Sequence, residues 1–238
     1  MKIEMLTRED GADRGRCDGA VGMAAQQSLP CIAIWLVARS IARGLPPPVA
    51  DHGGYRVDTN APDEIVRWVY PEVGPSLSAL AQGIDRPGHM VKACATPEQL
   101  SAALPEGWTV DAPGYFMAGP SAPLAPLACP AGYTLDVART GAVTQVRIVA
   151  GGGELAASAY AAETADAFIY DRIVTAPGHR RRGLGRVLMA TLRQAKLRAS
   201  APELLVATEE GRALYQALGW RTVSIFSTGS LSGYPSAQ

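Results

Sequence analysis

The feature that most constrains the fold is a turn between an apolar segment and a helix, in VTAPGHRRRGLGRVLMATL (174–192). The segment before it, AFIYDRIVT (167–175), is rich in β-branched and aromatic residues without polar alternation, which is typical of a central strand. After the turn, apolar residues recur at helical spacing, at Leu184, Val187, Leu188, Leu192 and Ala195. The chain is therefore expected to build a sheet whose central strand leads directly into an amphipathic helix.

The turn itself combines glycines with a helix start. Glycine lets backbone N–H groups approach an anion without interference from a Cβ atom. The first turn of a helix adds unpaired donors and a partial positive charge of about half an electron. This combination predicts a site for a phosphate or pyrophosphate, although the arginines alone also fit a solvated helix start or a nucleic-acid patch. No Lys-Ser/Thr follows the second glycine, so the turn is not a P-loop, and the three-glycine Rossmann pattern is absent.

Composition weighs against a general affinity for polyanions. The 238 residues carry a formal net charge of +0, with 47% hydrophobic and 18% charged residues. Without a global field, electrostatic recognition has to be local, and we expect neither a nucleic-acid nor a membrane partner. The longest apolar stretch, LPCIAIWLVA (29–38), is shorter than the ~20 residues that span a bilayer. It is interpreted as part of a helix in a cytoplasmic protein.

The cysteines and histidines give no metal-binding pattern. The four cysteines form no CxxC pair, and none of the three histidines lies near a cysteine. This predicts no metal, and free thiols in a reducing cytoplasm.

Three regions are expected along the chain. Residues 1–27 form a loosely ordered lead, and 28–120 an N-terminal α/β region. That region opens with a helix from Ser28, with Pro30 in its first turn, to a stop at Gly44. Short strands and two helices then alternate, in GYRVDT, RWVYP, SLSALAQGI, MVKACA, TPEQLSAAL, WTVDA and YFMAG.

The third region, 121–238, begins in a proline-rich stretch, PSAPLAPLACPAG (120–132). Three strands follow in YTLDVA, TQVRIVA and ELAASAYAA, with a glycine turn between the last two. Beyond the arginine turn and its helix, a strand, a helix and a closing strand are expected in ELLVAT, EEGRALYQAL and WRTVSIFST.

The arginine turn resembles the acetyl-CoA-binding motif of the GNAT N-acetyltransferase superfamily, Arg/Gln-x-x-Gly-x-Gly/Ala after a central strand. TEEGRALYQALGW (208–220) resembles the second signature of that family, and the two occur in the expected order. The resemblance covers about residues 130–230, with Thr175 and Thr208 standing where the family usually has Val and Asn. It implies an α/β (α+β) fold, a mixed and mostly antiparallel sheet flanked by helices.

The resemblance also implies acetyl-CoA as co-substrate. The amides of Arg181 to Arg186 would hold the pyrophosphate, and a strand N–H would polarise the thioester carbonyl. The residues implied in cofactor binding are Ile173, Val174, Thr175, Arg180, Arg181, Arg182, Gly183, Leu184, Gly185, Arg186 and Thr208.

Catalytic roles are assigned more narrowly. Tyr215 is the candidate general acid for the departing thiolate, with a core aromatic as the alternative. Asp171 is a candidate general base through a water, and a structural hydrogen bond is an equal alternative. Glu163 and Tyr170 are fallback bases, and His179 is interpreted as a surface histidine.

The resemblance implies an acetyl-CoA-dependent N-acetyltransferase, in which a primary amine of a small molecule or a protein attacks the thioester directly in a ternary complex. No cysteine lies in either signature, so a covalent acetyl-enzyme has no support. The alternative is a non-catalytic acyl-CoA-binding sensor or regulatory module. Between YTLDVA and TQVRIVA there is no room for two helices that the family usually has. The N-terminal half is therefore expected to supply that wall, as a degenerate half-repeat, and a homodimer is left open.

Overall fold

A computed structural model describes residues 24–120 and 125–231, with side chains from residue 31 onward. The expected lead of 1–27 lies almost wholly outside the described residues. The first helix, α1 (Ala24–Ala42), begins before Ser28, so the predicted start at Ser28 is wrong. The predicted stop is confirmed, because Gly44 follows the helix with a φ of 63°.

The N-terminal half contains each predicted strand and helix. Its elements are β1 (Val49–Asp51), β2 (Gly54–Asp58), β3 (Val66–Tyr70), α2 (Pro75–Gln82), β4 (His89–Ala93), α3 (Pro97–Ala103), β5 (Trp108–Val110) and β6 (Gly114–Ala118). The α3 start follows from its sequence, since Thr96 and Gln99 form a capping box and Pro97 stands first in the helix.

The C-terminal half follows the predicted order. Its elements are β7 (Tyr133–Thr140), β8 (Val143–Ala150), β9 (Leu155–Glu163), β10 (Phe168–Thr175), the short 3-10 helix η1 (Pro177–His179), α4 (Leu184–Gln194), β11 (Glu203–Ala207), α5 (Glu209–Ala217) and β12 (Arg221–Leu231). A tight turn joins β7 directly to β8, so no helix lies between them.

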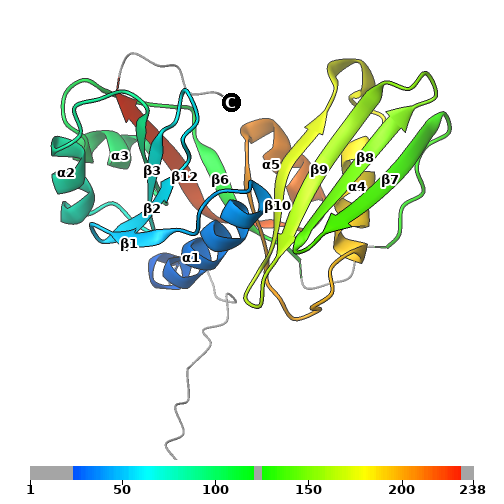
Figure 1. Cartoon of the computed structure of the whole chain (residues 1–238), viewed down its shortest axis with the longest axis horizontal. Helices are drawn as coiled ribbons and strands as arrows, with labels where there is room; N and C mark the ends of the chain where they lie inside the picture. Colours follow the sequence, from blue (N-terminus) through cyan, green and yellow to red (C-terminus); the bar gives the residue numbers. More distant parts are fainter. Residues whose placement is uncertain (1–23, 121–124, 232–238) are drawn as a thin grey trace, which may run out of the picture.

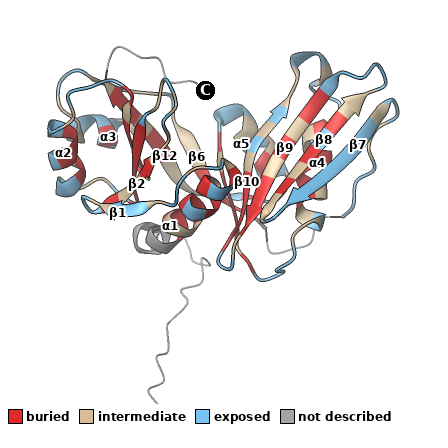
Figure 2. Cartoon of the chain, in the orientation of Figure 1, coloured by how far each residue is buried: buried red, intermediate tan, exposed pale blue. Residues whose placement is uncertain are grey.

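Within the described residues, all twelve strands belong to one sheet, in the order β1-β2-β3-β4-β12-β6-β11-β10-β9-β8-β7, with β5 paired to β12. Only β3 with β4 and β10 with β11 run parallel. This confirms the expected mixed, mostly antiparallel sheet flanked by helices. Figure 2 shows β7 exposed at one edge of the sheet.

The two halves repeat the same order of elements. In each, an antiparallel strand pair (β2–β3 or β9–β10) leads through a helix to a parallel strand and then to a second helix. The last strand of each half then pairs with a strand of the other half. β6, from the N-terminal half, pairs with β11, and β12, from the C-terminal half, pairs with β4. The boundary near residue 120 therefore divides the chain but not the sheet. This topology is what a degenerate half-repeat requires.

Helix α1 lies in the valley between the two halves (Figure 1). Its buried side chains pack on both, in one core with Val57 and Val69 from the N-terminal half and Ile169 and Leu204 from the C-terminal half. Helix α4 covers the opposite face of β8–β10. So α1, from the N-terminal half, takes the place of the wall that the short β7–β8 connection cannot supply.

Two further observations concern the cysteines and the possibility of a membrane-spanning helix. Cys31 is disulfide-bonded, so the expectation of free thiols is wrong for this residue, whereas Cys94 and Cys129 are free. Over residues 24–120 and 125–231, none of the helices is both long and apolar enough to cross a bilayer.

Candidate functional site

The turn between β10 and α4 has an unusual backbone. Gly183 is the N-cap of α4 in the left-handed region, with a φ of 80° and no side-chain cap. Arg181 also has a positive φ, 63°. These two residues turn the chain sharply, and Leu184 is buried and fixes the helix start to the core.

Five consecutive backbone N–H groups, from residue 181 to residue 185, have no hydrogen-bond acceptor within the described part of the chain. The run ends at Arg186, whose N–H donates to the Gly183 carbonyl at 3.0 Å. The expectation that the Arg186 amide belongs to the set is therefore wrong, although its exposed side chain remains at the same helix end. Free amides at a helix N-terminus form an anion site. We call residues 181–185 the cradle.

Side chains from β7 and η1 hold the cradle in place. Tyr133 Oη accepts a hydrogen bond from Arg182 Nη1 at 2.9 Å and lies 2.9 Å from His179 Nδ1. His179 Nε2 in turn lies 3.2 Å from a Glu154 carboxylate oxygen. His179 is thus a link in a chain of contacts behind the cradle rather than an isolated surface residue. The role of Tyr133 was missed, because sequence spacing gives no sign that β7 reaches this turn.

Tyr133→Phe should raise the KM for acetyl-CoA about three- to tenfold and leave kcat within about twofold, because it removes two hydrogen bonds that position the cradle. Steady-state kinetics measures this. Tyr70→Phe is the matched control, since it removes a hydrogen bond to the His52 carbonyl far from the cradle. Equal changes in both variants would contradict a positioning role.

Strands β10 and β11 separate beside the cradle. Their paired residues are Phe168 with Glu203 and Ile169 with Leu204, and beyond these β10 follows β9 whereas β11 follows β6. The register of β10 against β9 shifts between Asp171 and Val174, with Arg172 at a φ of 51°. A bulge of this kind bends a strand and frees backbone groups. The gap therefore offers unpaired strand edges for an extended ligand.

The predicted donor-site residues lie around this gap and the cradle. Ile173 packs against the core, and Val174 is 57% exposed, which is unusual for an apolar strand residue. Arg180 Nε lies 3.5 Å from the Thr175 carbonyl. Thr208 was implied in cofactor binding, and in the structure its side chain caps α5 by accepting a hydrogen bond from Gly211 N–H at 3.2 Å.

Tyr215 lies on α5 and is 6% exposed. Its ring packs near Trp220, with ring centroids 6.1 Å apart. Burial raises the pKa of the Tyr215 hydroxyl above its ordinary value. A raised pKa keeps the hydroxyl protonated at neutral pH, which both a proton donor and a core aromatic require.

Asp171 is held in an ion pair with Arg43, the residue that follows α1. Its two carboxylate oxygens accept from Arg43 Nη2 at 2.8 Å and Nε at 2.6 Å. A carboxylate with both oxygens occupied by a guanidinium is poorly suited to take up a proton. The geometry favours the structural alternative that the sequence left open for Asp171.

Asp171→Asn should lower the free energy of unfolding by about 1–3 kcal/mol, because it weakens a charge-assisted contact between the halves. Chemical denaturation measures this. Asp58→Asn, which breaks a pair with Arg56 at 2.8 Å where both side chains are 41% exposed, should cost less than about 1 kcal/mol. A fall in kcat of about 100-fold with unchanged stability would restore Asp171 as the base.

The two fallback bases are also engaged. The Glu163 carboxylate accepts from the N–H groups of Leu197 and Arg198, at 3.0 and 2.6 Å, and from Arg139. Its pKa is lowered overall, because these hydrogen bonds outweigh burial, the largest single influence, which raises it. Tyr170 donates to Glu203 at 2.7 Å in the core, and its pKa is raised mainly by burial.

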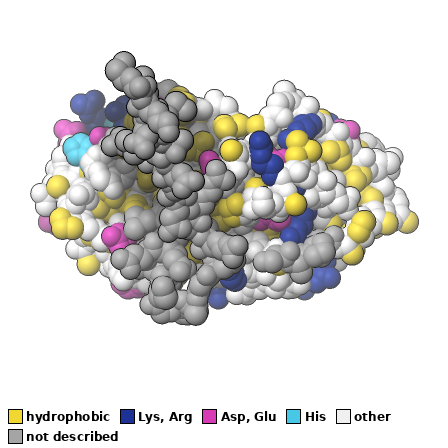
Figure 3. All heavy atoms as spheres, turned by 90° about the horizontal axis from the view of Figure 1, so that it is seen from below, with side chains coloured by type: hydrophobic (Ala, Val, Ile, Leu, Met, Phe, Trp, Pro, Cys, Tyr) yellow, Lys and Arg dark blue, Asp and Glu magenta, His cyan; other side chains and the backbone are white. Residues whose placement is uncertain are grey.

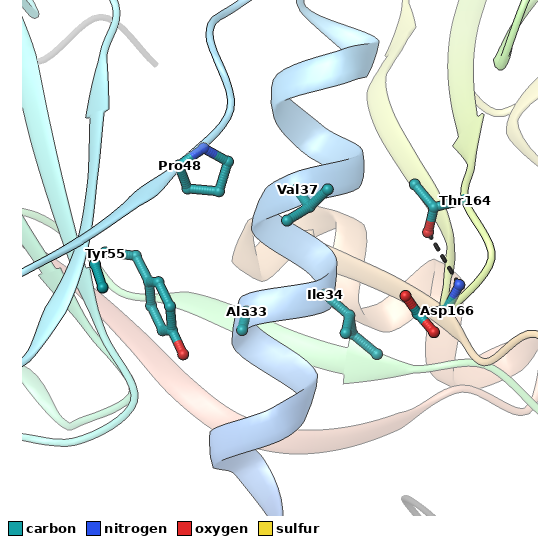
Figure 4. Close-up of a pocket in the computed structure, with 8 residues that line it drawn as sticks. Ala33, Ile34, Val37, Pro48, Tyr55, Thr164 and Asp166 are labelled. Carbon is teal, nitrogen blue, oxygen red and sulfur yellow. Dashed lines mark hydrogen bonds between the residues drawn. The ribbon is translucent and has the colours of Figure 1, made fainter. Parts of the chain in front are cut away.

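An apolar pocket lies away from the cradle, on the side of α1 (Figure 4). Ala33, Ile34 and Val37 of α1 face Tyr55 on one side and Thr164 and Asp166 on the other. Basic side chains on the face seen in Figure 3 stand in separate groups with acidic and hydrophobic side chains between them. Across the described ranges, His, Cys, Asp and Glu form no group of three that could hold a metal ion.

Comparisons with known proteins agree with the geometry. Residues 140–222 match the family model of the acetyltransferase (GNAT) domain. Over this segment of the 238 residues, the chain is similar to that family. No curated protein matches the sequence significantly.

Solved GNAT structures share the fold of nearly the whole chain. A GCN5-related N-acetyltransferase from Kribbella flavida has a TM-score of 0.59 at 17% identity, covering 90% of this chain and 97% of its own. One from Sphaerobacter thermophilus has a TM-score of 0.52 at 13% identity, covering 90% and 95%. A putative GNAT acetyltransferase from Novosphingobium aromaticivorans has a TM-score of 0.51 at 17% identity, covering 86% and 99%. The fold of the N-terminal half is thus part of an architecture found in these solved GNAT structures.

Proposed function

We propose that the protein is an acetyl-CoA-dependent N-acetyltransferase that transfers the acetyl group to a primary amine by direct attack in a ternary complex. The observation that carries this is the cradle of free amides at residues 181–185, next to the gap between β10 and β11. An anion site and an unpaired strand edge side by side suit the pyrophosphate and the amide-bearing arm of coenzyme A.

Each part of the site has a role in this proposal. The cradle amides bind the pyrophosphate, and the exposed side chains of Arg180, Arg181, Arg182 and Arg186 add positive charge beside it. The end of β10, Ile173–Thr175, pairs with the pantetheine arm, which covers Val174. A free N–H at the β10 bulge polarises the thioester carbonyl.

In the transfer step, the neutral amine nitrogen attacks the thioester carbon and then releases one proton to water as the amide forms. The C–S bond breaks, and the thiolate takes a proton from Tyr215. Tyr215 regains its proton from solvent after the products leave. An amine with a pKa of about 10 must first lose a proton. Because Asp171, Glu163 and Tyr170 are all engaged in protein contacts, we infer that this proton passes to water.

We also propose one cofactor site per chain, since the connection from β3 to α2 in the N-terminal half, PEVG, carries no basic residue. A small or protein amine as acceptor, no metal, no nucleic acid or membrane partner, and a cytoplasmic setting remain part of the proposal. The disulfide at Cys31 is unusual for a reducing compartment.

Thiol release from acetyl-CoA over a panel of amines tests the function, using the full chain. Turnover with at least one amine, with the acetylated amine identified by mass spectrometry, is the expected result. Tight acetyl-CoA binding without turnover for any amine would indicate the sensor instead.

A further inference from the structure

A group of charged side chains lies where the two halves meet, at the C-terminal end of α1. It has two members from β3 and β4, one just before β3, one after α1 and one on β10. We call it the junction cluster: Arg43, Glu64, Arg67, Lys92 and Asp171.

Helix α1 lies between the two halves (Figure 1), and Arg43 of the junction cluster directly follows it. Trp68 and Val91 pack on the opposite face of their strands, in the core with α2 and α3, so Arg67 and Lys92 point toward α1. Asp171 shares a strand face with Ile169, which belongs to the α1 core. Residues from both halves of the chain therefore form the junction cluster.

Basic groups outnumber carboxylates in and beside the junction cluster. Glu64 Oε1 forms an ion pair with Lys92 Nζ at 2.9 Å, and Glu64 Oε2 accepts from Arg67 Nη2. Both carboxylate oxygens of Asp171 accept hydrogen bonds from Arg43. Arg172 also contacts this site, with its Nε 3.6 Å from Asp171 Oδ2, so four basic groups share two carboxylates. The Arg67 side chain is only 4% exposed, yet its Nε and Nη1 atoms have no hydrogen-bond partner.

Such an arrangement destabilises the folded protein when no ligand is bound. A buried donor without an acceptor costs about 1–3 kcal/mol, and more when it is charged. Burial lowers the pKa of Arg67 to about 10, and burial is also the main cause that lowers the pKa of Lys92. Glu64 would be paired by Lys92 alone, so the cluster does not need Arg67 to balance its acids.

The position of the cluster relates it to the donor site. Asp171 lies two residues beyond the last β10–β11 pair and two residues before the β10 end that is proposed to hold the pantetheine arm. The cluster therefore flanks the place where an acceptor has to approach the thioester.

We propose that the junction cluster binds the carboxylate of the acceptor, with Arg67 as its main contact, and that the acceptors are small amines that carry a carboxylate. This inference rests on the proposed function. An incoming carboxylate supplies the missing negative charge and the acceptors that Arg67 lacks. A polyamine or a neutral amine supplies neither.

The test compares each of the twenty L-amino acids with its amino amide, and with spermidine, in the thiol-release assay. We expect kcat/KM for the best amino acid to exceed that for its amide at least tenfold. In Arg67→Met this preference should fall below about threefold, with the KM for acetyl-CoA unchanged, and Arg67→Lys should retain part of it. Arg86→Met, at an exposed arginine that is 78% accessible, is the control and should behave as the wild type.

A second readout separates this inference from the proposed function. The N-acetyl derivatives of the same amino acids should raise the Tm of the wild type, but not that of Arg67→Met, and their amides should raise neither. If no amine is acetylated, the proposed function fails and this binding arm alone decides the inference. Equal turnover of acids and amides, or no carboxylate-dependent rise in Tm where turnover is absent, would overturn it. Water would then be the partner of Arg67.

Discussion

Gly183→Val should weaken acetyl-CoA binding by about 10- to 100-fold. The φ of 80° at this N-cap is strained for a β-branched residue by about 1–3 kcal/mol. To relieve that strain the turn has to re-aim the amides of Leu184 and Gly185, which belong to the cradle. A Cβ atom at Gly183 would meet nothing within 4 Å, so the loss comes from backbone conformation and not from a clash. Calorimetric titration with acetyl-CoA measures the change in Kd.

Gly178→Val is the matched control for this variant. Gly178 lies in the same turn, in η1, with open space around its Cα and without a positive φ. It should bind acetyl-CoA within about threefold of the wild type. Equal losses of acetyl-CoA affinity in the two variants would mean that any bulky side chain in this turn weakens binding. An unchanged Kd in Gly183→Val would contradict the proposal that the cradle amides bind the cofactor.

Tyr215→Phe should lower kcat by about 100-fold or more and leave the Kd for acetyl-CoA within about twofold, because it removes the proton donor but keeps the buried ring. The raised pKa of Tyr215 means that its proton is kept up to pH 10 and beyond. The wild-type rate should therefore show no decline from loss of this acid below pH 10. Steady-state kinetics across pH measures both effects.

Tyr170→Phe separates a catalytic hydroxyl from a structural one. Tyr170 is another buried tyrosine whose ring packs on Trp220, but its hydroxyl donates to Glu203. It should lose stability, measured by denaturation, and keep most of its kcat. If Tyr215→Phe loses stability and acetyl-CoA affinity in the same proportion as kcat, Tyr215 is a core aromatic.

The sequence was sufficient for the elements and the cradle because both depend on local physics. The apolar run of β10, the glycines of the turn and the helical spacing after Leu184 each act over a few residues. Backbone donors at a helix start follow from that order of elements alone. The start of α1 was missed because Ser28 and Pro30 suit the first turn of a helix, whereas the helix begins at Ala24.

The long-range parts could not be read in the same way. The pairing of β6 with β11 joins residues far apart in the chain, and no local pattern specifies it. The Arg43–Asp171 pair is separated by 128 positions, so Asp171 looked equally suited to a base and to a structural contact. Arg67 did leave a sign, a charge inside the apolar strand VRWVY, although its unpaired atoms are visible only in the structure.

The most direct test of the central claim is to mix the full chain with acetyl-CoA and an amine panel, and to measure released thiol and acetylated amine together. The account predicts one acetyl-CoA bound per chain, and one acetyl amide formed for each thiol released, with both products lost in Gly183→Val at limiting acetyl-CoA. Thiol release without any acetylated amine, or two acetyl-CoA molecules bound per chain, would contradict it.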